Sequence, residues 1–94
     1  MKFSETLNNY IEQLDCKAKD ICKKSGISAA TLSRYRSGER LPDPNSEPLK
    51  RLCAAISEIA RDKGIEGICV ERVLEEFSNT EDFESLDTKQ LFEN

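Results

Sequence analysis

Histidine and tryptophan are both absent from this sequence of 94 residues. Histidine is the most frequent general acid or base near neutral pH, and it is also a common zinc ligand. The sequence also lacks a glycine loop that could hold phosphates, a nucleophile next to a base, and a convergent pair of carboxylates. These absences argue against an enzyme, and we expect no cofactor.

Closely spaced cysteine pairs are absent too. The spacing of the four cysteines is not that of a zinc site, and no histidine is present to complete a ligand set. Cys22 and Cys53 instead fall on the apolar faces of expected helices, where a free thiol behaves as a small buried hydrophobic group. We therefore expect no metal and a reducing, cytoplasmic environment. The four residues are Cys16, Cys22, Cys53 and Cys69.

Long apolar runs are missing from the chain. A membrane-spanning helix needs roughly 18 apolar residues, and the N-terminus has no apolar signal core. Hydrophobic residues make up 37% of the chain and charged residues 34%, which is the range of globular domains. We therefore expect one soluble domain with no membrane partner.

Charge is divided unevenly along the chain, although the net charge is −4. Residues 16–40 contain seven basic residues against two acids, a local charge of +5. Residues 71–94 contain eight acids against two basic residues, a local charge of −6. Because binding to a polyanion depends on where charge lies, the basic stretch favours a nucleic-acid partner.

Apolar residues recur at helical spacing throughout, and no segment is typical of a strand. Ser4 is a plausible N-cap of the first helix, whereas Ser28 and Ser46 are the expected caps of the third and fourth helices. Gly26 and Gly38 are expected to end the second and third helices. The sequence predicts an all-α, compact five-helix bundle. Its helices are expected at 4–14, from 15 or 16 to 25, 28–37, 46–63 and 70–77.

The chain divides at about residue 78. We expect residues 1–78 to form the domain and residues 79–94 to be an acidic linker or the start of a further helical unit, because this segment is polar with scattered apolar residues. The sequence stops where another helix would begin, which suggests a fragment of a longer protein.

Residues 18–38 have the pattern of two helices joined by a tight turn. The small Cys22 allows the helix backbones to cross closely, and Gly26 tolerates the positive φ that the turn requires. The expected inward-facing residues are Ile21, Ile27, Leu32 and Tyr35. The expected outward-facing residues of the second helix of the pair are Ala29, Ala30, Ser33 and Arg34.

The stretch from Ile21 to Pro42 resembles the Cro and lambda-repressor-like family of helix-turn-helix regulators, also called the xenobiotic-response-element type. Ser33-Arg34-Tyr35 matches the family's serine–basic–aromatic signature, and Gly38-Glu39-Arg40-Leu41-Pro42 matches its Gly-x-Arg/Lys-x-Pro signature. The resemblance covers residues 3 to about 62 and is most specific over 18–42. It implies a bacterial or phage-type transcriptional regulator that binds double-stranded DNA, with residues 28–37 in the major groove.

The resemblance also implies roles for individual residues. Arg34 is the expected base-contacting residue, with guanine as its natural target, and the alternative is a solvated surface arginine. Alanines at 18, 29 and 30 replace the family's frequent glutamines, and they can contact thymine methyl groups. Arg36 stands where the family commonly has an acid, and Glu12 is a candidate partner for it. The expected DNA-binding residues are Lys17, Ala18, Ser28, Ala29, Ala30, Ser33, Arg34 and Arg40.

Several of these roles have ordinary structural alternatives. Lys17 and Arg40 are either phosphate contacts or a charged rim, and Lys23 and Lys24 are most simply an exposed polar face. Family members often bind DNA as dimers, so a homodimer is a candidate assembly, with the fourth helix, the fifth helix and the C-terminal segment all open as its contact. The alternative function is a protein-interaction module that keeps the fold without binding DNA.

Overall fold

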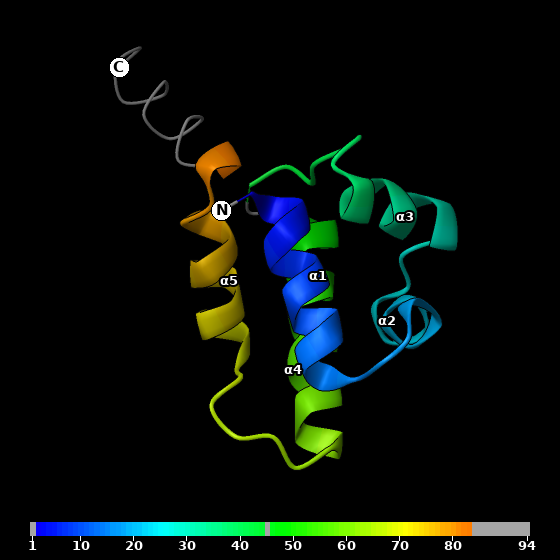
Figure 1. The fold of residues 1–94 in the computed structure, drawn as a ribbon, viewed down its shortest axis with the longest axis vertical. Coiled ribbons are helices and arrows are strands. Elements are labelled where there is room, and N and C mark those ends of the chain that lie inside the picture. Colours follow the sequence, from blue (N-terminus) through cyan, green and yellow to red (C-terminus); the bar gives the residue numbers. More distant parts are fainter. Residues whose placement is uncertain (1, 45, 84–94) are drawn as a thin grey trace.

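The computed structural model describes residues 2–44 and 46–83, and these residues form an all-helical domain (Figure 1). The expected all-α fold is therefore confirmed. No helix in the described part of the chain is both long enough and apolar enough to cross a membrane. The helices are α1 (Phe3–Leu14), α2 (Ala18–Ser25), α3 (Ala29–Ser37), α4 (Glu47–Asp62) and α5 (Val70–Ser78).

The junction between α1 and α2 differs from the expectation. Asp15 has φ 51° and ψ 45°, a left-handed backbone that ends α1, and its N–H bonds to Glu12 O at 3.1 Å. The chain re-enters a helix only at Ala18, after Lys17, whose backbone N–H donates to Asp20 Oδ2 at 3.0 Å. The predicted start of this helix at 15 or 16 was therefore two to three residues early.

The N-terminus of α1 was also assigned wrongly. Ser4 lies inside α1 rather than at its cap, because the helix already begins at Phe3. The backbone N–H of Lys2 donates to Glu5 Oε1 at 2.9 Å, and the N–H of Phe3 donates to Asp82 Oδ2 at 2.9 Å. One of the unpaired donors of this helix end is thus satisfied from a distant part of the chain.

The ends of α3 and α4 agree with the prediction. Ser28 Oγ accepts the N–H of Thr31 at 3.2 Å, and Ser46 Oγ accepts the N–H of Leu49 at 3.4 Å. Gly38 closes α3 with φ 86°, a conformation that costs glycine no side-chain clash. Serine at the start and glycine just past the end are local signals, so these boundaries could be predicted from sequence.

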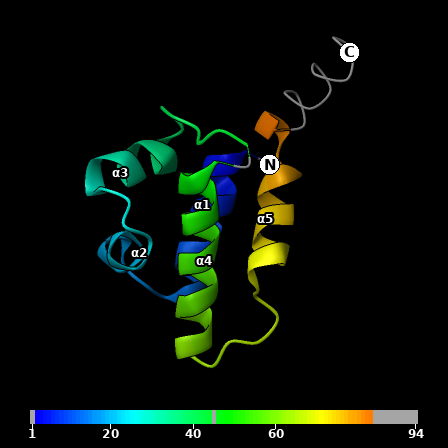
Figure 2. The ribbon, with the colours of Figure 1, turned by 180° about the vertical axis from the view of Figure 1, so that it is seen from behind.

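The core lies around α1 and α4, which run side by side, with α5 on one flank and the α2–α3 pair on the other (Figures 1 and 2). Each helix contributes apolar residues at three- and four-residue spacing. Val73 and Phe77 of α5 are buried and Leu74 is partly buried, whereas Cys22, which was expected to be buried, is only partly so. The fully buried large side chains are Phe3, Phe77, Leu7, Leu14, Ile21, Leu32, Leu49, Leu52, Ile56, Val73 and Cys53.

The chain after α5 folds back against the start of α1. Phe83 is 2% exposed, and its ring lies 5.5 Å from that of Phe3 in an edge-to-face arrangement. Phe3 also contacts Phe77, with ring centroids 4.6 Å apart. Residues 79–83 were expected to belong to an acidic linker or to the start of a further helical unit, and Thr80 and Phe83 are both buried.

Candidate nucleic-acid interface

Helices α2 and α3 are joined by a turn of three residues, Gly26–Ser28. Gly26 has φ 77°, and its N–H bonds to Cys22 O at 2.9 Å, which closes α2. The buried hydroxyl of Ser25 then accepts the N–H of Ile27 at 3.1 Å. These bonds hold the two helices at a fixed angle, as a helix-turn-helix requires.

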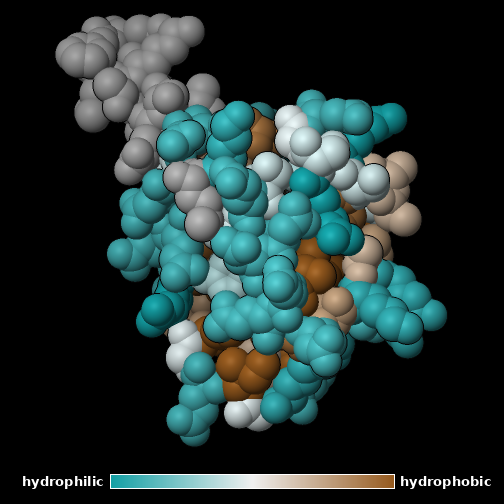
Figure 3. Space-filling view, viewed as in Figure 1, coloured by the Kyte–Doolittle hydropathy of each residue, from teal (hydrophilic) through white to brown (hydrophobic). Residues whose placement is uncertain are grey.

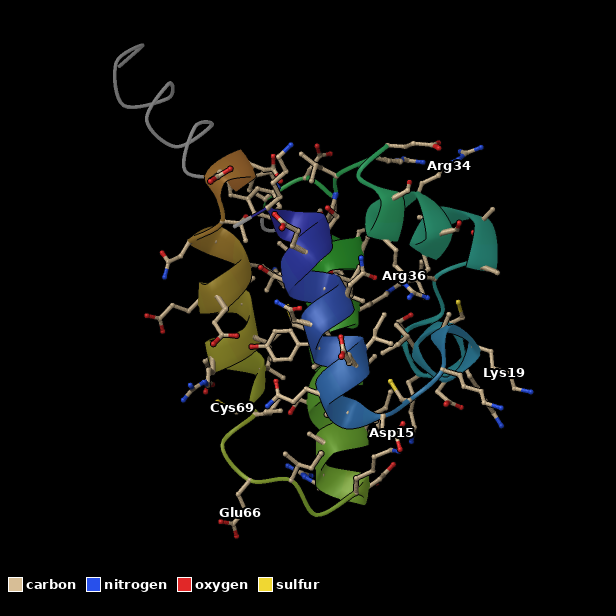
Figure 4. The ribbon with its side chains drawn as sticks, viewed as in Figure 1. Asp15, Lys19, Arg34, Arg36, Glu66 and Cys69 are labelled. Atoms are coloured by element: carbon tan, nitrogen blue, oxygen red, sulfur yellow. The ribbon has the colours of Figure 1, made fainter. Side chains whose placement is uncertain are left out.

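The two faces of α3 differ in exposure. Leu32 and Tyr35 are 0% and 2% exposed, and Tyr35 packs edge-to-face with Phe3. The opposite face is open to solvent, and Figure 4 shows Arg34 extending from the edge of the molecule at α3. The exposed residues of this face include Ala29, Ala30, Ser33 and Arg34.

The other predicted contact residues lie near α3 or at the start of α2. Lys17, Ser28 and Arg40 are exposed, and Ala18 is half-buried. The loop after α3 folds toward the helix end, since the N–H of Arg40 donates to Arg34 O at 3.3 Å. The structure thus brings the predicted residues to the α2 and α3 part of the molecule, on the side away from α5 (Figure 1).

A groove of about 610 Å³ lies between α2 and α3. Hydrophobic side chains are visible at the junction of these helices with α1 in the space-filling view (Figure 3). Three predicted residues line the groove, namely Ala18, Ala29 and Ser33. Its other lining residues, which sequence reasoning did not assign to the site, are Asn8, Lys19, Cys22, Arg36 and Ser37.

Arg36 contacts α1, but its partner is Asn8 rather than Glu12. Arg36 Nε donates to Asn8 Oδ1 at 2.7 Å, and Asn8 Nδ2 donates to the backbone oxygen of Arg36 at 3.0 Å. Asn8 precedes Glu12 by four residues, about one helical turn. The proposed ion pair was wrong because charge complementarity alone could not choose between neighbouring turns of α1.

Lys24 differs from the other lysines of the basic stretch. Its Nζ lies 3.2 Å from Glu58 Oε1 and 3.0 Å from Asp62 Oδ2, both on α4. The hydrogen bond to Asp62, followed by that to Glu58, raises the pKa of Lys24 above its ordinary value. Lys24 is exposed as expected, but two carboxylates of α4 neutralise its charge.

This architecture is a helix-turn-helix whose second helix is exposed beside basic side chains. It is the architecture of a class of DNA-binding domains. Residues 6–58 match the Cro/C1-type helix-turn-helix DNA-binding domain. The chain belongs to this family, and the match runs from α1 into α4, leaving α5 outside it. A search of curated proteins found no significant match. A search of solved structures also found none.

Proposed function

We propose that this protein binds double-stranded DNA in a sequence-specific manner, with α3 in the major groove, as part of a transcriptional regulator. The observation that carries the proposal is the two-sided character of α3. The buried Leu32 and Tyr35 attach the helix to the core, and Arg34 extends outward from its exposed face. A helix held in this way can enter a groove without losing its own packing.

Arg34 is the residue we assign to base recognition. Its guanidinium can donate two parallel hydrogen bonds to O6 and N7 of guanine, which distinguish this base from the others in the major groove. Ala29 and Ala30 at the start of α3 have no donor or acceptor in their side chains, so their contribution is apolar contact with thymine methyl groups. Ser33 is a further exposed polar group of this face.

We assign Lys17, Ser28 and Arg40 to the DNA backbone. Lys17 and Arg40 carry exposed positive charge beside α2 and after α3, respectively. Ser28 lies at the N-terminus of α3, where free N–H groups and the helix dipole favour an anion. The half-buried Ala18 lies in the first turn of α2 and brings no side-chain bulk to the surface.

Selection of bound sequences from random duplex DNA tests the proposal directly. We expect an enriched consensus, and a palindromic consensus would indicate two copies of the chain on one site. Binding of the consensus should weaken with salt, with a log–log slope of about −0.9 for each neutralised phosphate. A chain that bound no duplex at low salt would contradict the proposed function.

Arg34→Ala tests the role of α3 in specificity. We expect a loss of about 1–3 kcal/mol at one base pair of the consensus, with relaxed preference at that position. Arg72→Ala on α5 is the matched control, because it removes an exposed arginine far along the chain from α3. An equal loss on all sequences would instead make Arg34 a phosphate contact.

A further inference from the structure

The guanidinium of Arg36 is held in place through its Nε atom. Asn8 bonds both to the side chain of Arg36, at 2.7 Å, and to its backbone oxygen, at 3.0 Å. A guanidinium carries five N–H donors, and Nε is the one that bonds to a partner among residues 2–44 and 46–83. The terminal nitrogens therefore keep donors that this part of the protein does not use.

These donors belong to a side chain that lines the groove between α2 and α3. Figure 4 shows Arg36 between α3 and α1, with Lys19 on α2 further out. Lys19 and Arg36 are the charged residues among the eight that line the groove, and none of the eight is an acid. By contrast, the cleft between α1 and α5 has Glu76 as its charged lining residue.

A fixed guanidinium with unused donors is suited to an oxyanion with more than one oxygen. Arginine binds phosphate through parallel hydrogen bonds, and anchoring the side chain beforehand reduces the entropy lost on binding. We propose that Arg36, positioned by Asn8, binds a backbone phosphate of DNA in the groove between α2 and α3, with Lys19 further out on the rim of the same groove. This proposal rests on the proposed function, since it adds a subsite to the same interface.

The location of Arg36 favours a phosphate over a base edge. Arg36 is half-buried, whereas Arg34, which lies in the same last turn of α3, is exposed. A recessed cation reaches the DNA backbone beside the groove more easily than the base edges inside it. A phosphate contact carries no sequence information, so its loss should weaken binding to all duplexes alike.

The test compares Arg36→Gln with Arg72→Gln. Glutamine at 36 can still hydrogen-bond to Asn8 but removes the charge, and Arg72→Gln removes the same charge from α5. Binding to a mixed-sequence duplex is measured over a salt series. We expect the log–log slope of Arg36→Gln to be smaller in magnitude by about 0.9, the value of one phosphate, and that of Arg72→Gln to be unchanged. A slope for Arg36→Gln equal to that of the unaltered chain overturns the proposal.

The salt series on the unaltered chain separates the two proposals. If that chain binds duplex with a steep salt dependence while Arg36→Gln keeps the same slope, the proposed function stands and the phosphate subsite fails. Absence of any duplex binding overturns both. Circular dichroism checks that each variant is helical.

A second measurement keeps the proposal testable even when Arg36→Gln fails to fold. In the unaltered chain, the NMR signal of the Arg36 Nε–H is followed as duplex is added, with that of Arg72 as reference. A shift of the Arg36 signal alone supports the subsite, and no shift refutes it. A parallel titration uses inorganic phosphate in place of duplex. If phosphate shifts the Arg36 signal fully at the same concentrations as duplex does, the site binds free anions and is not a DNA contact.

Discussion

Phe83 provides the sharpest test of where this domain ends. The family match stops at residue 58, and the sequence pattern suggested a linker or the start of a further helical unit from residue 79. Yet the Phe83 ring is 2% exposed and packs against Phe3. Phe83→Ala removes a fully buried ring, a change that typically costs about 3–5 kcal/mol through lost transfer energy and the cavity left behind.

This loss would be large for a domain of this size. Small proteins have free energies of unfolding of about 5–15 kcal/mol, so about a fifth of the total or more is at stake. The assay is urea unfolding followed by circular dichroism, with the stability taken from the midpoint at constant slope. Val70→Ala is the control, because Val70 is 40% exposed and surface changes usually stay within about 0.5 kcal/mol.

A second variant separates the packing of this segment from its hydrogen bond. Asp82 Oδ2 accepts the Phe3 N–H at 2.9 Å, as an N-cap residue would, so Asp82→Ala should cost about 1 kcal/mol. Asp82→Asn keeps an acceptor oxygen and should lose less. A loss below about 1 kcal/mol for Phe83→Ala would refute the argument, because it would place Phe83 with the surface residues.

The remaining predictions concern two buried polar groups. The Tyr10 hydroxyl is buried and has no hydrogen-bond partner among the described residues. Tyr10→Phe should therefore leave the free energy of unfolding unchanged or raise it by up to about 1 kcal/mol, and the urea midpoint should stay the same or rise accordingly. A clear fall in the midpoint would contradict the absence of a partner. Burial raises the pKa of Cys53 from its ordinary value of 9.0 to about 12, so a thiol reagent at mildly alkaline pH should modify the exposed Cys69 and spare Cys53 until the chain unfolds. Because the unfolded chain releases the Cys53 proton first, stability should fall as pH rises from 9.0 toward about 12, by up to about 1.4 kcal/mol per pH unit from this group. Cys53→Ala should remove this part of the fall and leave the part due to Lys24. Equal modification of both thiols in the folded chain would show that Cys53 is accessible.

The α3 segment shows what local signals can predict. Its start follows from Ser28, its end from Gly38, and the spacing of Leu32 and Tyr35 defines its buried face. Each of these features depends on residues within a few positions along the chain, so no knowledge of the packing was needed. The link between α1 and α2 could not be predicted in the same way, because Asp15 adopts a left-handed backbone that non-glycine residues rarely take.

The groove between α2 and α3 required the tertiary structure. Arg36 and Asn8 are 28 residues apart, and several polar residues of α1 could have been the partner of Arg36. Lys24 is separated from Glu58 by 34 residues, so its neutralisation by α4 was equally hidden. A count of charges along a stretch treats all its basic residues alike, whereas packing decides which of them remain available to bind an anion.

The amino-acid order alone therefore determined the helical class, the caps of α3 and its buried stripe, because helix periodicity and capping act over one or two turns. Tertiary packing decided that Asn8 orients Arg36, that Lys24 is paired and that Phe83 joins the core. These contacts join residues far apart in the chain, and their energies depend on how whole helices lie against one another rather than on any short run of residues.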